Sequence, residues 1–225
     1  MSGHIVAIGG GWPAADPRSS LDELMLSLTD ATRPRVCFVP TAAGDSDRVI
    51  AAFFEAFSRR NCEPSCLRLF GVPDRPVERL ATADVIYVAG GNTANALAIW
   101  RLHGVDVALR EAWERGAVLG GASAGANCWF ECCVTDSFGL ELDPRHDGLG
   151  VLPGSFCPHY DGEERRRPRY RSLVDGGFPA GYAADDDAAF HFEGTEFREV
   201  VSARTGACGY RVEPGSETPI APRLL

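Results

Sequence analysis

The sequence contains no lysine, and all 22 of its basic side chains are arginine. Without a lysine amine the chain cannot form a lysine Schiff base or a Ser–Lys dyad, so those mechanisms are excluded. The 31 acidic residues give a formal net charge of −9, and an averaged field of this sign repels nucleic acid and anionic lipid. We therefore expect neither a nucleic-acid partner nor a membrane partner.

Long apolar runs are also missing. Nowhere do about 18 apolar residues follow one another, as a membrane-spanning helix requires. The apolar stretch at Ile5–Ile8 is too short for the core of a signal peptide, and no basic region precedes it. These features favour a soluble, cytoplasmic protein.

The usual motifs for cofactors and structural metals are absent as well. The run Gly9–Gly11 lacks the Gly-x-Gly-x-x-Gly spacing of a dinucleotide site because position 14 is alanine, and no Gly-Lys-Ser/Thr follows it. The eight cysteines lack the paired two-residue spacing of a zinc ribbon, and in a chain of this size without an export signal we expect them to be reduced thiols. We expect no cofactor and no metal.

Apolar residues make up 45% and charged residues 24% of the 225 residues, which is typical of one folded globular domain over residues 1–225. The first two-thirds of the chain alternates short apolar runs with helical patterns, as β-α-β units of a parallel sheet do. The expected strands are 5–8, 35–39, 66–70, 84–89, 117–120, a strand through 152, 188–192 and 198–202. The expected helices are 21–28, 48–59, 94–101, 107–115 and 163–174.

One segment carries the strongest chemical signal. Gly121–Gly125 has the Gly-x-Ser-x-Gly form, in which small neighbours allow Ser123 to occupy a strained turn between a strand and a helix with its hydroxyl exposed. The N–H groups of the helix expected to begin at Ala124 point toward Ser123, where a developing oxyanion needs donors. The segment therefore predicts a nucleophile elbow and acyl-transfer chemistry.

A serine hydroxyl needs a base, and His159 is the favoured histidine. It follows Cys157-Pro158 after an expected strand, so its side chain can reach the carboxyl end of the sheet. The remaining histidines lie in strand, corner or loop contexts where a structural or solvated role is expected; they are His4, His103, His146 and His191. A carboxylate to orient the base can come from Asp136 or from the run Asp185–Asp187, and the residues alone leave both open.

Four segments together carry a family resemblance: Gly90–Thr93, Gly121–Asn127, Cys157–Tyr160 and Asp185–Ala189. They resemble the S51 serine peptidases, whose best-known members are aspartyl dipeptidases. The resemblance extends from the first expected strand to about Gly194. It implies a flavodoxin-like α/β fold related to the class I glutamine amidotransferases, a three-layer sandwich with a mostly parallel sheet.

The resemblance also implies roles for individual residues. Ser123 matches the nucleophile and His159 the base, and the backbone N–H groups of Gly91 and Ala124 match the oxyanion hole. The third member of the triad matches Asp186, which we favour, or Asp136.

For the substrate, the resemblance implies a small peptide, foremost a dipeptide that begins with aspartate. An arginine in a Gly-Glu-x-Arg stretch after the catalytic histidine is the expected partner of the aspartate side chain, and Arg165 in Gly162–Arg165 occupies that position. We expect the enzyme to be a monomer or a homodimer.

Other readings remain open at this point. An S51 peptidase of broader specificity and a cyanophycinase share the same chemistry and differ in substrate. An esterase of the α/β-hydrolase class is another alternative, because Ser123, Asp136 and His159 follow one another in the chain order that is typical of that class. A ligand-binding module without catalysis requires an unreactive Ser123. A metal hydrolase has to use His159, Asp161 and Glu163, for which no His-Glu-x-x-His helix exists.

Overall fold

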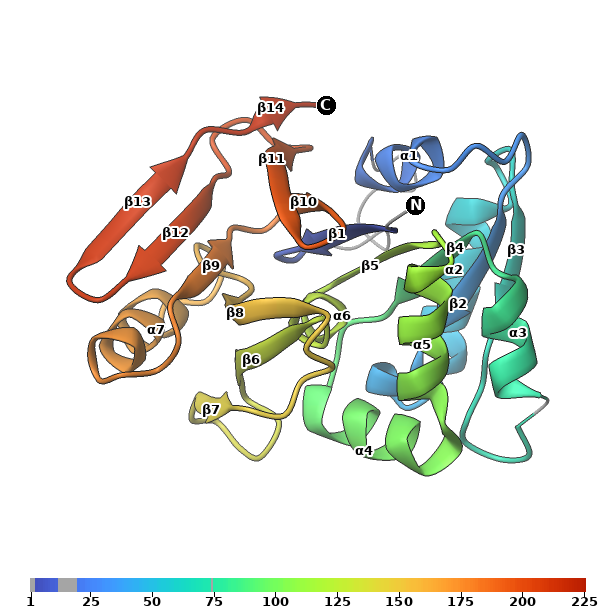
Figure 1. Cartoon of the computed structure of the whole chain (residues 1–225), viewed down its shortest axis with the longest axis horizontal. Coiled ribbons are helices and arrows are strands. Elements are labelled where there is room, and N and C mark those ends of the chain that lie inside the picture. Colours follow the sequence, from blue (N-terminus) through green and yellow to red (C-terminus); the bar gives the residue numbers. More distant parts are fainter. Residues whose placement is uncertain (1–2, 12–19, 74) are drawn as a thin grey trace.

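The computed structural model describes residues 3–11, 20–73 and 75–225, which form two β-sheets and the helices around them (Figure 1). The larger sheet contains β1 (His4–Ile8), β2 (Arg35–Val39), β3 (Glu63–Cys66), β4 (Val85–Val88), β5 (Val118–Ala122), β10 (Ala188–Glu193), β11 (Glu196–Ser202) and β14 (Arg223–Leu224). The smaller sheet contains β6 (Phe130–Thr135), β7 (Asp143–Arg145), β8 (Leu152–Cys157), β9 (Gly181–Ala184), β12 (Gly209–Glu213) and β13 (Ser216–Ile220). The helices are α1 (Ser20–Ser27), η1 (Thr41–Ala43), α2 (Asp47–Phe57), α3 (Pro76–Thr82), α4 (Thr93–His103), α5 (Val105–Glu114), α6 (Ala124–Asn127) and α7 (Arg166–Asp175).

The larger sheet has the strand order β14-β11-β10-β1-β5-β4-β2-β3. The five strands from β1 to β3 in this order run parallel, and β10 joins β1 in antiparallel orientation. Apolar side chains of α1 and α2 pack on one face of the parallel strands, while those of α3, α4 and α5 pack on the other. The predicted α/β class, with helices on both faces of a mostly parallel sheet, is confirmed.

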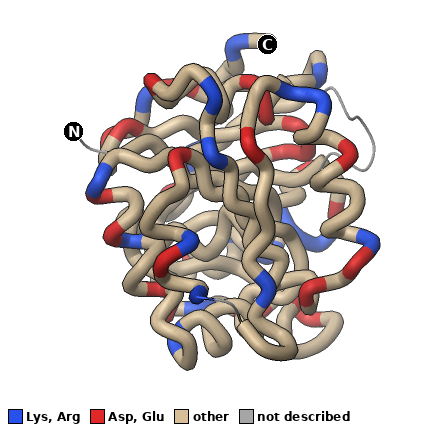
Figure 2. Tube along the Cα trace, turned by 90° about the vertical axis from the view of Figure 1, so that its right-hand side faces the viewer, with Lys and Arg blue, Asp and Glu red and all other residues tan. Residues whose placement is uncertain are grey.

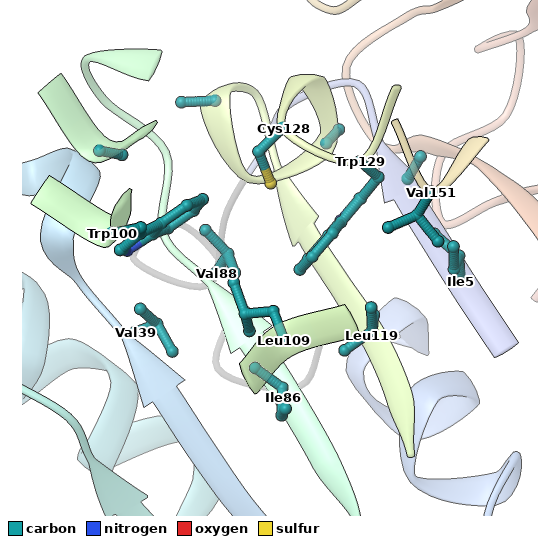
Figure 3. Packing of buried hydrophobic residues seen from close by; sticks show 14 of the residues in the cluster. Ile5, Val39, Ile86, Val88, Trp100, Leu109, Leu119, Cys128, Trp129 and Val151 are labelled. Carbon is teal, nitrogen blue, oxygen red and sulfur yellow. The ribbon is translucent and has the colours of Figure 1, made fainter. Parts of the chain in front are cut away.

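Aromatic side chains fill both faces of this sheet. On one face Phe38 of β2 stacks on Phe53 of α2 with ring centroids 4.4 Å apart. On the other face Trp100 and Trp129 are fully buried among apolar side chains of β2, β4 and β5 (Figure 3). The indole N–H of Trp100 donates to the hydroxyl of Thr41 at 3.0 Å, so burial of the ring leaves no unpaired donor. This bond holds η1 in place, and η1 in turn contacts the loop that follows β4 through the hydrogen bond from the Asn92 N–H to the Ala42 carbonyl.

The bounds of most predicted elements agree with the structure to within two residues, and two elements differ by more. The strand expected at residues 66–70 is wrong, because β3 ends at Cys66. The backbone N–H groups of Leu69 and Phe70 donate to the carboxylate of Asp45 instead of a neighbouring strand. The helix expected at 163–174 begins three residues later, at Arg166.

The smaller sheet has the order β13-β12-β9-β8-β6-β7 and is not among the sequence predictions apart from the strand that contains Leu152. Its strands β6, β8 and β9 run parallel, with antiparallel strands added at both sides. The chain after β8 leads to His159, and the chain after β9 leads to Asp185–Asp187. This sheet therefore delivers two of the predicted site segments to the larger sheet.

Charged residues are spread over the surface, with acidic and basic positions interspersed on the face that Figure 2 shows. No stretch of helix in the described part of the chain combines the length and the apolar character needed to cross a membrane. Of the eight cysteines, which all carry free thiols, six are buried and two are partly exposed.

Candidate functional site

Ser123 lies between the end of β5 and the start of α6, as the elbow motif predicts. Its backbone has φ 58° and ψ −114°, a conformation that non-glycine residues rarely adopt and that costs on the order of 1–3 kcal/mol. The glycines at 121 and 125 are required here, because a Cβ on either would come closer than 3.0 Å to the carbonyl oxygen of Val88. The strain and the close packing together give the geometry of a nucleophile elbow.

The end of β1 organises the site. The carbonyl oxygens of three consecutive residues, 8 to 10, accept hydrogen bonds from three distant loops. Ile8 accepts from the N–H of Ser123 at 3.1 Å, Gly9 from that of His159 at 3.2 Å, and Gly10 from that of Asp187 at 3.1 Å. One short segment thus holds the loops of Ser123, His159 and Asp187 together. Sequence reasoning excluded a nucleotide site at these glycines but assigned them no other role.

His159 and Asp186 form a hydrogen-bonded pair. Nδ1 of His159 lies 2.7 Å from Oδ1 of Asp186, and both side chains are partly exposed. This hydrogen bond is the main reason why the pKa of Asp186 lies below its usual range, and the nearby positive charges of Arg204 and Arg166 act in the same direction. Asp186 is therefore ionised at neutral pH, as the orienting carboxylate of a histidine base has to be.

The other two residues of the acidic run have different partners. Oδ2 of Asp185 accepts from the N–H of Cys208 at 2.9 Å, and burial raises the pKa of this carboxyl group. The carboxylate of Asp187 accepts from Nε of Arg204 at 3.2 Å. Only the middle residue of the three reaches His159 in the described structure.

Asp136, the alternative third member, lies elsewhere in the site. Its Oδ1 is 3.7 Å from Nη2 of Arg166, and its side chain is 55% exposed. Among the described residues, His159 is not one of its partners. Asp136 lines the same pocket as Ser123, so the structure puts it beside Ser123 and not in contact with His159.

The pocket at Ser123 has a volume of about 300 Å³, and one arginine and two carboxylate side chains line it. It is lined by Gly91, Asn92, Ser123, Asp136, Ser137, Glu163 and Arg166. Arg166 is buried, with a side chain only 3% exposed, and Nε donates to Glu163 at 2.6 Å while Nη1 donates to the carbonyl of Val134 at 3.2 Å. Sequence reasoning missed this residue.

Arg165, the arginine expected to bind substrate, does not line the pocket at Ser123. Its side chain is 66% exposed, and its guanidinium donates to the carbonyl of Leu140 and lies 3.7 Å from Glu141. It lines an adjacent hollow that shares Asp136 and Glu163 with the first pocket.

The two backbone donors expected for an oxyanion hole flank Ser123. A Cβ at Gly90 would lie 3.4 Å from Cβ of Ser123, so the loop after β4 passes close to Ser123. Gly91 has φ 134°, and a Cβ there would come closer than 3.0 Å to the carbonyl of Ala42, so only glycine fits. Ala124 is the first residue of α6, where the N–H has no partner within the helix.

The three residues weighed for a metal site have separate partners. His159 bonds Asp186, Asp161 bonds Arg204, and Glu163 bonds Arg166. No group of three or more His, Cys, Asp or Glu side chains in the described ranges is arranged to hold a metal ion.

Replacing Gly10 by alanine should lower kcat by about 10²–10³-fold, because displacement of catalytic groups by about 1 Å costs on that order. A Cβ at this position would come closer than 3.0 Å to Oδ1 of Asp186 and to the ring of His159, so the pair has to separate. Steady-state kinetics on a substrate that the parent protein turns over measure the effect. The matched control is Gly44→Ala, which strains a turn residue with φ 64° but places no atom within 4 Å of the added Cβ, so it leaves the catalytic pair in place. Equal loss in both variants would contradict the role of Gly10.

With this geometry in hand, comparisons with known sequences point to one family. The model of Peptidase family S51 matches residues 5–200. The chain is 49% identical over 212 residues to the uncharacterized peptidase YgaJ of Bacillus subtilis (strain 168), which covers 93% of this chain and 91% of that protein. It is 31% identical over 127 residues to peptidase E of Streptomyces coelicolor, and the match covers 56% of this chain and about half (51%) of that relative.

The fold has a solved counterpart. A peptidase from an acI-B1 Actinobacterium superposes with a TM-score of 0.73 at 20% identity, covering 99% of this chain and 95% of that one. At this identity the likeness concerns the fold. It covers both sheets, so the smaller sheet that the sequence did not predict is part of the shared architecture.

Proposed function

Since the chain belongs to peptidase family S51, we propose that it is a serine-type peptidase that cleaves short peptides, foremost dipeptides with an N-terminal aspartate. The observation that carries the proposal is the strained Ser123 turn held on the same strand end as the His159–Asp186 pair. A serine at an elbow, a histidine and an ionised carboxylate are the parts that acyl transfer requires.

In the proposed mechanism Oγ of Ser123 attacks the peptide carbonyl while His159 takes the hydroxyl proton. The Nδ1–H of His159 donates to Asp186, which leaves Nε2 as the accepting nitrogen and balances the imidazolium that forms. The same proton then passes from His159 to the leaving amine, and an acyl-enzyme on Ser123 remains. Water, deprotonated by His159, releases the acid product and restores the serine.

The oxyanion of each tetrahedral intermediate is assigned to the N–H groups of Gly91 and Ala124. Backbone donors fixed before the reaction stabilise developing charge without a cost of reorganisation. Gly91 is held by its contact with Ala42, and the next N–H, that of Asn92, donates to the Ala42 carbonyl at 2.8 Å. This bond anchors the loop to η1 next to the N–H assigned to the oxyanion.

Charges in the Ser123 pocket suit a substrate with a free N-terminus and an acidic side chain. Arg166 lines this pocket, and its Nη2 is 3.7 Å from Asp136, which is longer than a hydrogen bond, so we assign Nη2 as the donor to a substrate carboxylate. The carboxylates of Asp136 and Glu163, about half exposed, can attract the α-ammonium group. We assign Arg166, rather than its exposed neighbour Arg165, as the cation that binds the aspartate side chain.

Replacing Arg166 by methionine should lower kcat/KM for Asp-Leu by about 10²-fold and change that for Leu-Leu little, because only the acidic substrate loses a partner for its desolvated carboxylate. The matched control is Arg165→Met, which we expect to stay within about threefold of the parent protein, since exposed ion pairs contribute little. The reverse order of the two variants would return the role to Arg165.

A panel of dipeptides and tripeptides beginning with Asp, Glu, Asn or Leu tests the proposed specificity before any mutation. Release of free amino acid measures turnover. Equal cleavage of neutral and acidic substrates would place the protein among S51 peptidases of broader specificity. Turnover of p-nitrophenyl acetate without peptide cleavage would favour an esterase.

A further inference from the structure

Arg204 occupies the turn after β11, beyond the residues that the family model matches. Its guanidinium makes three hydrogen bonds to the two loops that carry His159 and Asp186. Nε donates to the carboxylate of Asp187 at 3.2 Å, while Nη2 donates to Asp161 at 2.6 Å and to the backbone carbonyl of Asp186 at 2.9 Å. None of these bonds involves the reacting atoms assigned above.

The backbone of Asp186 is held from both sides by this arrangement. Its N–H donates to the carboxylate of Asp161 at 2.8 Å, and its carbonyl accepts from Arg204. Asp161 follows His159 by two residues, so the Arg204–Asp161 pair joins the base loop to the acid loop. A shift of either loop changes the 2.7 Å contact between His159 and Asp186.

The loops also contain backbone strain that these bonds have to offset. His159 has φ 53° and Asp187 has φ 65°, both in the left-handed region, and such residues persist where surrounding contacts over-determine the conformation. The Asp187 carbonyl accepts from the N–H of Ala203 and the hydroxyl of Ser202, next to Arg204 in the chain. The turn after β11 therefore fixes the acid loop through several contacts, of which Arg204 makes those that also reach the base loop.

We propose that Arg204 is a positioning residue of the catalytic pair: it locks Asp186 at the distance and angle at which the carboxylate orients His159. The inference rests on the proposed function of that pair. The planar guanidinium reaches three acceptors at once, whereas a lysine ammonium carries the same charge on a flexible stem without the fixed fork. The proposed role therefore depends on the shape of the guanidinium as well as on its charge. Substitution by lysine, which keeps the charge and loses the shape, separates these two contributions.

Replacing Arg204 by alanine should lower kcat about 10–100-fold and leave KM within about threefold, because the substrate pocket is unchanged while the pair loses alignment. Arg204→Lys should recover only part of the loss. The matched control is Arg198→Ala: Arg198 is 47% exposed against 43% for Arg204 and pairs with two carboxylates, but it does not contact either loop. Wild-type kcat in Arg204→Ala, or the same loss in Arg198→Ala, would overturn the proposal.

A direct signature keeps this test apart from that of the proposed function. We expect the Nδ1 proton that His159 shares with Asp186 to give a low-field proton NMR resonance, which can be assigned by its loss in His159→Ala. We expect the resonance to broaden or disappear in Arg204→Ala and to persist in Arg198→Ala, whatever substrate the enzyme cleaves. An unchanged resonance in Arg204→Ala would overturn the positioning role even if the enzyme prefers N-terminal aspartate. If the dipeptide panel shows no such preference, the resonance still tests the positioning role.

If Arg204→Ala does not fold, Asp161→Asn supplies the second test. This variant keeps Arg204 but weakens both bonds that the Asp161 carboxylate accepts, one from the Asp186 N–H and one from Nη2 of Arg204. We expect a fall in kcat of about tenfold with a broadened His159 resonance and little change in KM. Normal kcat together with an unchanged resonance in Asp161→Asn would overturn the bridge between the two loops.

Discussion

Replacing Ser123 or His159 by alanine should each lower kcat for the best dipeptide by about 10⁶-fold, because nucleophile and base act as a unit and loss of either removes covalent catalysis. About 10³–10⁴-fold of acceleration over water should remain from binding and the oxyanion donors. The double variant should be scarcely worse than either single one. Steady-state kinetics at high enzyme concentration and circular dichroism of each variant make the measurement.

The control for this prediction is His191→Ala. His191 contacts His4 at 3.1 Å, at the opposite end of β1 from the Ser123 loop, so its removal should not affect the chemical step. Mass spectrometry after treatment with a sulfonyl fluoride adds a test without substrate, in which the parent protein gains one label and Ser123→Ala gains none. Full activity in Ser123→Ala, or a greater loss in His191→Ala than in His159→Ala, would refute the assigned mechanism.

The elbow could be predicted from the sequence because its requirements are local. A short apolar strand, two glycines and a following helix lie within ten residues, so the motif can be identified without knowing that both glycines pack against Val88 of β4. The family resemblance, confirmed by the match over residues 5–200, rested on the same kind of local segment. A short segment that determines both a local backbone shape and the position of a reactive side chain can be interpreted from the sequence alone.

The role of Gly9 and Gly10 could not be predicted in this way. Their absent side chains make room for Asp185 and for the His159–Asp186 pair, which lie more than 140 residues away in the chain. Nothing near Gly10 in sequence indicates that contact, which exists only once β1 pairs with β10 and the loop after β8 reaches the same edge. Glycines that accommodate distant segments look like ordinary turns.

The choice between Arg165 and Arg166 shows a different limit. Neighbouring residues at the start of a helix project about 100° apart, so one enters the pocket and the other faces solvent. A run of five arginines between 165 and 171 contains no apolar pattern that fixes which of them turns inward. The hydrogen bonds of Arg166 to Glu163 and to the Val134 carbonyl decide it, and Val134 lies on a strand that the sequence did not reveal.

The smaller sheet was missed because its strands are short and pair over long distances. β7 has three residues and β9 has four, too few to show alternation between polar and apolar positions. Its C-terminal strands β12 and β13 also contain polar or small residues at most positions. Arg204 lies in the turn between β11 and β12, so the positioning role proposed for it could not be predicted from the sequence either.

Replacing Asp186 by asparagine should lower kcat by about 10⁴-fold, because an amide that donates to Nδ1 favours the wrong tautomer of His159 and leaves the imidazolium without a counter-charge. The hydrogen bond with His159 already holds the pKa of Asp186 below its usual range, so the carboxylate is present wherever the neutral base can act. The fold should survive, since an amide has the same shape and the backbone of residue 186 keeps its bonds to Asp161 and Arg204. The low-field proton of His159 should be lost with the activity.

The matched variant is Asp136→Asn, in which the other candidate carboxylate becomes an amide. Asp136 lies in the Ser123 pocket and pairs with Arg166, so we expect its loss to raise KM for substrates with a free N-terminus and to leave kcat within about tenfold. Measuring kcat and KM separately for both variants distinguishes a residue behind the base from one beside the substrate. If Asp136→Asn lowers kcat more than Asp186→Asn does, the triad is Ser123, His159 and Asp136, and the close contact between His159 and Asp186 has a structural role instead.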